Sequence, residues 1–349
     1  HHLAKLTMKV IFLGAGAWGT AMAMHASKNP KGFDVTLWSR SLPLADEMIK
    51  THRNQKYLPN IDLPLQLKIG ADWETIFTHA DEQDLLVIAT PVSGLKETVH
   101  ALLKLKQVPK NWVWLCKGLE PGTSLMPHQV IERELKLANA MDRGISLAVL
   151  SGPSFASEVA KGMPCALTAA SSSAELVALV QQVFHHGNMR VYGSDDVVGV
   201  ELGGAIKNVL AIATGIGDGL GLGLNARAAV LTRGLSEMMR LIISMGGKSE
   251  TAMGLTGVGD LILTATGDLS RNRQVGLQLA SGKKLSEVLS ALGHVAEGVR
   301  CAQAVNDLAK TKGIEMPITH MVCEVLFNEQ DVAEAVKLLM SRDARPESR

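Results

Sequence analysis

Three closely spaced glycines near the N-terminus have the spacing of a dinucleotide-binding turn. Gly14, Gly16 and Gly19 lie in the segment GAGAWG, between the apolar run 8–13 and a helix-like stretch over 20–27. In such a turn the first glycine permits the tight bend, the second lets the backbone approach a pyrophosphate, and the third lets helix and strand pack closely. The pyrophosphate then lies at the helix N-terminus, among unpaired N–H groups. Because a strand precedes the turn and a helix follows it, we interpret the segment as a binding turn rather than a merely structural one.

The end of the second apolar run bears on the choice of dinucleotide. Residues 33–38 are followed by Ser39 and Arg40, and no acid stands where NAD-specific sites bind the ribose hydroxyls. A guanidinium can pair with a 2′-phosphate, so we expect NADP(H) to be accepted or preferred. The alternative interpretation of Arg40 is a solvated surface arginine.

A single lysine in an apolar helix is the candidate acid–base group. Lys207 lies in the predicted helix 201–211 and shares a helix face with Leu210 and the small residues Gly203, Gly204 and Ala211. Those small residues would let a substrate or a nicotinamide ring approach. Burial and nearby cations lower a lysine pKa toward neutrality, which suits proton transfer to or from an alcohol oxygen. The alternative is a lysine whose ammonium group reaches solvent at the helix edge.

Two further segments offer positive charge to an anionic ligand. Lys117 follows the apolar run 112–116, at the carboxyl end of a predicted strand, where ligands collect in parallel sheets. Ser270 is a candidate N-cap for a helix that begins with Arg271 and Asn272. Free N–H groups beside a guanidinium would make a phosphate site. The alternative for this second segment is a capped surface helix.

The elements that must position these residues divide the chain in two. Short apolar runs alternate with helix-compatible stretches in the first half and predict a mostly parallel sheet covered by helices on both faces. The predicted strands are 8–13, 33–38, 84–89, 111–116, 146–150 and 165–170. From 196 to 339 the periodicity is helical. We therefore expect an α/β N-terminal Rossmann-like doubly wound sheet, a dinucleotide-binding domain over 8–193, followed by an all-helical C-terminal domain for substrate and catalysis over 194–342.

Composition agrees with two domains and excludes several classes of protein. The chain has 349 residues, of which 46% are hydrophobic, enough for two cores. Lys+Arg 35 against Asp+Glu 34 gives a net charge of +1, which argues against a nucleic-acid partner. The four cysteines are far apart, show no metal-ligand spacing and are expected to be reduced core thiols. None of the 11 histidines lies in a Ser/His/Asp order or in a metal-ligand pattern.

Targeting signals are also missing from the pattern. No apolar run approaches the roughly 18 residues of a membrane span, and no signal peptide is visible, so we expect no membrane insertion and a cytoplasmic location. Residues 1–7 precede the first strand and are either a tag remnant or a natural extension.

Longer motifs follow one another over residues 8–327. They are GAGAWGTA from Gly14, N-x-x-Y-L-P from Asn54, KGLEPGTSLMPHQVI from Lys117, SGPSFASEVAKGMP from Ser151, ELGGAIKNVLAIATGIGDGL from Glu201, NARAAVLTRGLSEM from Asn225, MGLTGVGDLILTATGDLSRNR from Met253 and VAEGVR from Val295. Through this series, which covers nearly the whole chain, the sequence resembles the bacterial NAD(P)-dependent glycerol-3-phosphate dehydrogenases.

The resemblance implies a reaction, a cofactor and an assembly. The reaction is oxidation of sn-glycerol 3-phosphate to dihydroxyacetone phosphate, or in cells mainly the reverse reduction, which supplies the phospholipid backbone. The cofactor is NAD(P)H, and the assembly is a homodimer. Lys207 is implied to accept the proton in oxidation and to donate it in reduction.

The resemblance also implies two sets of binding residues. The substrate-binding set is Lys117, Gly152, Ser154, Asn208, Asp260, Thr264, Ser270, Arg271 and Asn272. The cofactor-binding set is Gly14, Gly16, Ala17, Trp18, Gly19, Arg40, Lys117, Ala156, Arg271, Val295 and Glu297. One departure from the family pattern is Leu224, before Asn225, where relatives often carry a small or acidic residue, which leaves the local loop geometry open.

Two rival functions are consistent with parts of the pattern. A two-domain dehydrogenase of the 3-hydroxyacid or 6-phosphogluconate type would share the glycine turn and the Lys-Asn pair, but its acid-specific pocket motif is not visible. A regulator that senses NAD(P)(H) without turnover is the rival from another class. The presence of Lys117, Lys207, Asp260 and Arg271 argues against it.

Overall fold

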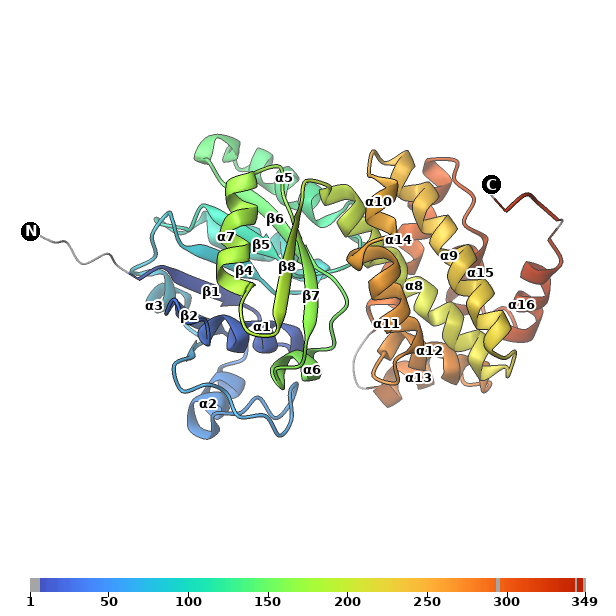
Figure 1. Ribbon diagram of the computed structural model, residues 1–349, viewed down its shortest axis with the longest axis horizontal. Coiled ribbons are helices and arrows are strands. Elements are labelled where there is room, and N and C mark those ends of the chain that lie inside the picture. Colours follow the sequence, from blue (N-terminus) through green and yellow to red (C-terminus); the bar gives the residue numbers. More distant parts are fainter. Residues whose placement is uncertain (1–6, 293–295, 343, 348–349) are drawn as a thin grey trace, which may run out of the picture. The chain divides into compact units, whose positions relative to one another are not determined.

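The computed structural model describes residues 7–292, 296–342 and 344–347, which form two compact units (Figure 1). Unit 1 contains the described residues of His1–Lys117 together with Met126–Glu201. Unit 2 contains Gly118–Leu125 and the described residues of Leu202–Arg349. The units therefore divide inside helix α8 (Val197–Gly219), later than the boundary expected at 193/194. The first turns of α8 belong to unit 1 because buried Glu201 accepts hydrogen bonds from Trp114 Nε1 at 3.0 Å and His128 N at 3.1 Å.

Unit 1 is built on an eight-stranded sheet with the order β3-β2-β1-β4-β5-β6-β7-β8. The strands are β1 (Lys9–Leu13), β2 (Asp34–Trp38), β3 (Lys68–Gly70), β4 (Leu85–Ile88), β5 (Asn111–Trp114), β6 (Ser146–Ser151), β7 (Cys165–Ala170) and β8 (Met189–Ser194). All neighbours are parallel except β6 and β7. The strand order reverses between β1 and β4, and ligands of open α/β sheets bind at such a point. The predicted Rossmann-like sheet is confirmed.

Two strands were not predicted. β3 has three residues, too short to give a periodic signal, and β8 alternates buried and exposed residues along a polar segment. Both pair with a strand that the sequence did predict, β2 and β7 respectively, so their partners stabilise them where local propensity does not.

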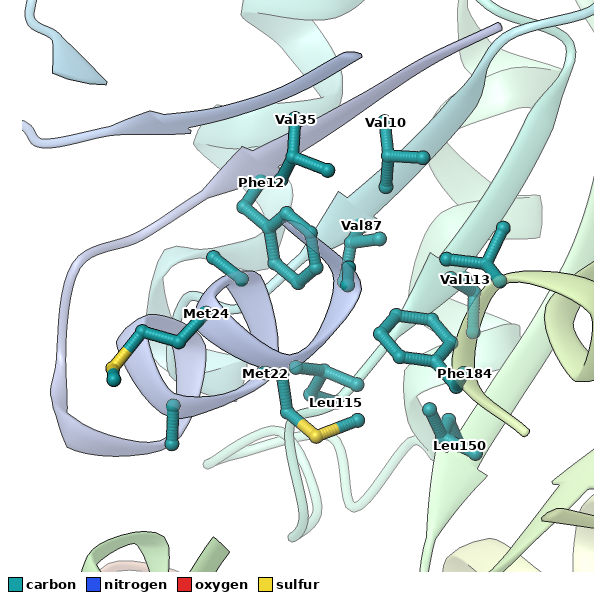
Figure 2. Close-up of a cluster of buried hydrophobic side chains, with 14 of the residues drawn as sticks. Val10, Phe12, Met22, Met24, Val35, Val87, Val113, Leu115, Leu150 and Phe184 are labelled. Carbon is teal, nitrogen blue, oxygen red and sulfur yellow. The ribbon is translucent and has the colours of Figure 1, made fainter. Parts of the chain in front are cut away.

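Helices cover this sheet and build its core. They are α1 (Ala17–Ser27), α2 (Leu42–Thr51), α3 (Trp73–Phe77), α4 (Leu95–Leu103), α5 (Pro127–Leu137), α6 (Ala156–Ala160) and α7 (Ala174–Phe184), with the 3₁₀ turns η1 (Val92–Gly94) and η2 (Met141–Arg143). Figure 2 shows Met22 and Met24 of α1 beside Phe12 of β1 and Phe184 of α7. The two phenylalanine rings meet edge to face, with centroids 6.1 Å apart. This packing fixes α1, and with it the glycine turn that α1 follows.

In the described residues of unit 2, every regular element is a helix, as predicted. They are the rest of α8, α9 (Leu224–Ser244), α10 (Ser249–Ala252), the π-helical turn η3 (Leu255–Gly259), α11 (Asp260–Thr266), α12 (Arg271–Ala280), α13 (Leu285–Leu292), α14 (Glu297–Thr311), α15 (Pro317–Phe327) and α16 (Val332–Met340). Gly118–Leu125 joins these helices, and Ser124 Oγ donates to Ala304 O of α14 at 2.8 Å.

Helix α8 corrects one expectation. With 23 residues it is, by length and composition, long and apolar enough to cross a membrane, so the expectation that no run approaches that length was wrong. Its charged residues Glu201, Lys207 and Asp218 hid the apolar character in the sequence. Because 89% of its apolar window is buried, α8 has the surroundings of a core helix.

The cysteines correct a second expectation, that all four are thiols of the core. All four are free, but only Cys301 and Cys323 are buried, whereas Cys116 and Cys165 are partly exposed. Cys116 lies beyond the end of β5 and Cys165 is the first residue of β7, and strand ends are covered less completely than strand centres.

Candidate active site

The glycine turn joins β1 to α1 in unit 1. Gly14 has a φ of 125°, in the left-handed region that favours glycine, and a Cβ there would lie 2.8 Å from Ala89 O. A Cβ on Gly19 would lie 2.3 Å from Gly14 O, so helix and strand need a glycine at this contact. Around Gly16, by contrast, a Cβ would meet nothing within 4 Å. Two of the glycines are therefore required by close packing, and the one between them faces open space.

The start of α1 and the end of the neighbouring strand β4 offer donors without a partner. No side chain caps the N-terminus of α1, and its first turn carries no acid, so its N–H groups remain available to an anion. Among the described residues, buried Trp18 Nε1 and Thr90 Oγ1 have no hydrogen-bond partner. Buried polar groups without a partner are costly, and a bound ligand would satisfy them. These features fit the pyrophosphate of a dinucleotide. Thr90 was not predicted, although its place two residues beyond a buried strand was a usable signal.

A buried asparagine is hydrogen-bonded to the glycine turn and to the helix that follows it. Asn54 Nδ2 donates to Ala15 O at 2.8 Å and to Thr20 Oγ1 at 2.9 Å, and Asn54 is fully buried. It opens the N-x-x-Y-L-P motif, which the sequence singled out without assigning a role. Through these two hydrogen bonds Asn54 stabilises the conformation of the glycine turn.

The remaining cofactor candidates occupy different positions. Arg40 is exposed, two residues beyond the end of β2, the strand that pairs with β1. Ala156 is the first residue of α6, which packs against α1. Glu297 begins α14 in unit 2, where burial raises the pKa of its carboxyl group while Arg300 and Arg271 oppose that rise. Val295 lies outside the described residues.

In unit 1 the structure brings three of the substrate candidates together at one carbonyl group. Lys117 Nζ donates to Gly152 O at 3.1 Å, and Ser154 Oγ donates to the same oxygen at 3.0 Å. Gly152 follows β6 with a φ of 149°, and a Cβ there would lie 3.0 Å from Ala166 O of β7. The Gly-Pro-Ser turn is therefore held against the sheet, and the Gly152 carbonyl group brings the lysine that follows β5 together with the hydroxyl group of the turn.

Lys207 of α8 is the centre of a second group, in unit 2. It is 6% exposed, and its Nζ donates to Asp260 Oδ1 at 3.0 Å and to Thr264 Oγ1 at 3.1 Å. Asp260 and Thr264 are one turn apart on α11, so they face the same side. A nearby cation would lower the pKa of a lysine, whereas the carboxylate of Asp260 stabilises the ammonium form.

The residues next to Lys207 do not all have the role expected from their size. A Cβ on Gly203 would lie 2.7 Å from Thr256 O of the π-helical turn η3. Gly203 thus serves the packing of α8 against η3 rather than the approach of a ligand. Since η3 leads directly into Asp260, this contact sets the position of the lysine's partner.

Helix α12 begins as predicted. Ser270 is its N-cap, and its Oγ accepts a hydrogen bond from Arg273 N at 3.2 Å. Arg271, the first helical residue, is exposed. Arg273, by contrast, forms an ion pair with Asp218 at 3.1 Å, and this pair connects the start of α12 to the end of α8.

Asn208 and Asn272 are also brought together, but in the helix packing. Asn272 Nδ2 donates to Asn208 Oδ1 at 3.1 Å, and Asn272 Oδ1 accepts from Gly298 N at 2.9 Å. One donor and one acceptor atom of the Asn272 side chain are therefore engaged within unit 2. Gly298 was not predicted to have a role.

Comparisons with known proteins extend over the same residues. The model of the NAD-dependent glycerol-3-phosphate dehydrogenase N-terminus matches residues 9–177, and the model of the C-terminus of that family matches 196–337. A glycerol-3-phosphate dehydrogenase (NAD(P)+) from Polynucleobacter asymbioticus is 62% identical over 343 residues, 98% of this chain and 100% of the relative. One from Cupriavidus taiwanensis is 57% identical, over 97% of this chain and 100% of the relative. The crystal structure of glycerol-3-phosphate dehydrogenase from Coxiella burnetii has a TM-score of 0.88 at 40% identity and covers 96% of this chain and 99% of its own.

Proposed function

Since this chain belongs to the family of NAD(P)-dependent glycerol-3-phosphate dehydrogenases, we propose that Lys207 exchanges the proton with the oxygen of the reacting carbon. When bound, NAD(P)(H) supplies or accepts the hydride. The observation that carries the proposal is a buried lysine held by Asp260 and Thr264. Because the carboxylate of Asp260 stabilises the ammonium form, Lys207 holds the proton that the carbonyl oxygen receives in the reductive direction.

The substrate of this proposal is dihydroxyacetone phosphate, or sn-glycerol 3-phosphate in reverse. The start of α12 supports a phosphate role, because a capped helix N-terminus and the exposed Arg271 offer several donors to one dianion. In unit 1, Lys117 and Ser154 support the binding of substrate oxygens at the Gly152 turn. Asp260 and Thr264 hold Lys207 in place.

The cofactor part of the proposal concerns the adenosine end. Arg40, exposed beyond β2 where an acid would bind the ribose of NAD, is proposed to pair with the 2′-phosphate of NADP(H). The family resemblance supports three further proposals: a homodimer, a cytoplasmic location, and a supply of sn-glycerol 3-phosphate for phospholipid synthesis.

The test is a kinetic one. Lys207→Ala should lower kcat for reduction of dihydroxyacetone phosphate by at least about 100-fold, because proton transfer is lost. Binding of NADPH should persist, since the glycine turn belongs to unit 1. Lys207→Arg should not restore turnover, because a guanidinium does not release its proton near neutral pH. Absorbance at 340 nm with NADPH and with NADH measures turnover and cofactor preference, and nucleotide fluorescence measures binding.

Lys283→Ala is the matched control, because Lys283 is an exposed lysine of the same unit. This variant should keep the parental kcat. Near-normal turnover by Lys207→Ala would remove the lysine from the chemistry.

A further inference from the structure

A buried carboxylate outside the proposed substrate and cofactor sets is hydrogen-bonded to two separate elements of unit 1. Glu201, in the first turns of α8, is 4% exposed. Its Oε2 accepts from Trp114 Nε1 at 3.0 Å and from His128 N at 3.1 Å, and its Oε1 is hydrogen-bonded to His128 Nδ1. Burial raises the pKa of this carboxyl group, while the bonds from His128 and Trp114 oppose that rise. Both oxygens are therefore engaged in directional bonds.

The two elements lie at the two ends of one loop. Trp114 is the last residue of β5, and His128 is the second residue of α5. The loop between them carries Lys117 and continues into the segment that belongs to unit 2, Gly118–Leu125. Glu201 therefore joins both ends of the loop through one side chain.

Lys117 lies where the loop changes its attachment. Its Nζ donates to Gly152 O at 3.1 Å, within unit 1. The next residue, Gly118, begins the segment that Ser124 Oγ bonds to α14 in unit 2. Gly118 has a φ of 132°, a conformation that favours glycine. The position of the lysine therefore depends on how firmly the ends of the loop are held in unit 1.

We propose that Glu201 is a positioning residue for Lys117, because it fixes both ends of the loop that carries this lysine. The inference rests on the function proposed above, in which Lys117 binds substrate oxygens at the Gly152 turn. A buried charge is weak evidence of added stability, since an apolar side chain of similar size often packs as well. Its directional hydrogen bonds, by contrast, select one arrangement of the end of β5 and the start of α5.

Two variants of similar size separate hydrogen bonding from packing. Glu201→Met accepts no hydrogen bonds of this strength, whereas Glu201→Gln keeps an oxygen for Trp114 Nε1 and His128 N. Burial lowers the pKa of His128, and the carboxylate that raises it is absent from Glu201→Gln. At about pH 8 the histidine ring of this variant is therefore neutral, and its Nδ1 accepts from the new NH₂ group.

Equilibrium binding without turnover gives the first readout. Dihydroxyacetone phosphate is titrated in the presence of NADP⁺ at about pH 8. Its Kd should rise by at least about tenfold in Glu201→Met and by less than about threefold in Glu201→Gln, because only the first variant leaves the buried donors without an acceptor. Equal Kd values for the two variants would overturn the proposal.

A double-mutant cycle with Lys117→Met gives a readout that a merely structural role would not move. If Glu201 acts through Lys117, Glu201→Met should weaken binding by less than about threefold once the lysine is absent. General damage to the fold would instead add to the loss caused by Lys117→Met. Additive losses would therefore overturn the proposal.

Two more variants complete the experiment. Trp114→Phe removes one donor and keeps Glu201 and its bonds to α5, so the Kd should rise by at least about threefold, again only while Lys117 is present. If Glu201→Met does not fold, this variant decides, and a parental Kd would overturn the proposal. Glu175→Met, at an exposed glutamate of α7, should bind as the parent does.

The lysine variant distinguishes the two levels of the argument. If Lys117→Met alone binds dihydroxyacetone phosphate as tightly as the parent, the proposed substrate role of Lys117 fails, and the positioning role of Glu201 fails with it. A loss in Lys117→Met without a loss in Glu201→Met would overturn the positioning role alone.

Discussion

At the scale of single residues, this protein places its positive charges in different environments. Lys207 is buried and paired with Asp260, whereas Arg271 is exposed at the start of α12. Arg273, two residues further on, is engaged by Asp218. A charge already paired within the protein holds helices together, while an exposed charge at a helix N-terminus remains available to a ligand.

We predict that Arg271→Ala will act through the substrate phosphate. Loss of one charge-assisted contact should cost about 1.5–3 kcal/mol, or roughly tenfold to a few hundredfold in kcat/KM for dihydroxyacetone phosphate. The residual rate with unphosphorylated dihydroxyacetone should barely change, as a double-mutant cycle requires. Steady-state kinetics of the parent and of Arg271→Ala, each with dihydroxyacetone phosphate and with dihydroxyacetone, measure these two effects.

Arg300→Ala is the control for an indirect effect, because Arg300, like Arg271, interacts electrostatically with Glu297. If Arg300→Ala reproduces the loss, or if Arg271→Ala impairs both substrates equally, the phosphate assignment of Arg271 has to be withdrawn.

At the scale of elements, glycines set the distance between the two helices that carry the site of unit 2. A Cβ on Gly215 of α8 would lie 2.1 Å from Arg273 O, and a Cβ on Gly276 of α12 would lie 2.2 Å from Ile212 O. The backbones of α8 and α12 are therefore in direct contact. This contact lets Asn272 reach Asn208 and places the start of α12 near the end of α8.

Gly276→Ala should destabilise the protein even though alanine is the better helix former. Overpacking against a backbone that cannot move away costs about 1–3 kcal/mol or more, which outweighs the roughly 1 kcal/mol gained in helix propensity. Gly217→Ala is the control on α8, since a Cβ there would meet only Leu222 Cδ1, at 3.9 Å. It should be neutral or slightly stabilising. Thermal unfolding measures both, and similar melting temperatures for the two variants would contradict the close contact.

At the scale of the whole molecule, the pH dependence of stability is the sum of the contributions of buried titratable groups in both units. In unit 2, burial raises the pKa of Glu237 on α9 to about 7, although its carboxylate accepts from Ile318 N at 2.6 Å at the start of α15. In unit 1, burial lowers the pKa of His25, which stacks on His186, to about 4. The folded protein therefore binds more protons than the unfolded chain at Glu237 and fewer at His25.

The two groups give opposite slopes. The contribution of Glu237 is complete below its ordinary value of 4.5 and is lost as the pH rises to about 7. That of His25 grows as the pH rises from about 4 to 6.5. We predict that Glu237→Gln, which imitates the protonated carboxyl group, will gain stability relative to the parent across the Glu237 range, by up to about 3 kcal/mol.

Urea unfolding of the parent and of Glu237→Gln at several pH values measures this difference in stability. The contribution of His25 is the same in both proteins and cancels. Glu334→Gln, at an exposed carboxyl group of α16, should show no such trend. A difference between parent and Glu237→Gln that does not change with pH would mean that Glu237 does not bind a proton on folding in this range.

Features that depend on neighbours along the chain could be predicted from the amino-acid sequence. The glycine turn, six of the eight strands, the helical character of unit 2 and the Ser270 cap are all local patterns, and the ordered motifs pointed to the family that the comparisons confirm. Strands β3 and β8, the antiparallel pairing of β6 with β7 and the apolar length of α8 were missed, because strand pairing and burial are decided by other segments.

The contacts among the site residues, by contrast, depend on the packing of segments that are far apart in the sequence. Asp260 lies 53 residues from Lys207 and Asn272 lies 64 residues from Asn208, distances over which no periodicity carries information. The sequence therefore predicted Lys207 as the acid–base group without identifying its partner, and folding supplied the carboxylate of Asp260. It predicted Gly203 beside a ligand, and folding placed Thr256 there. Residue types and local spacing set which chemistry is available, whereas the partner, polarity and reach of each group follow from helix packing.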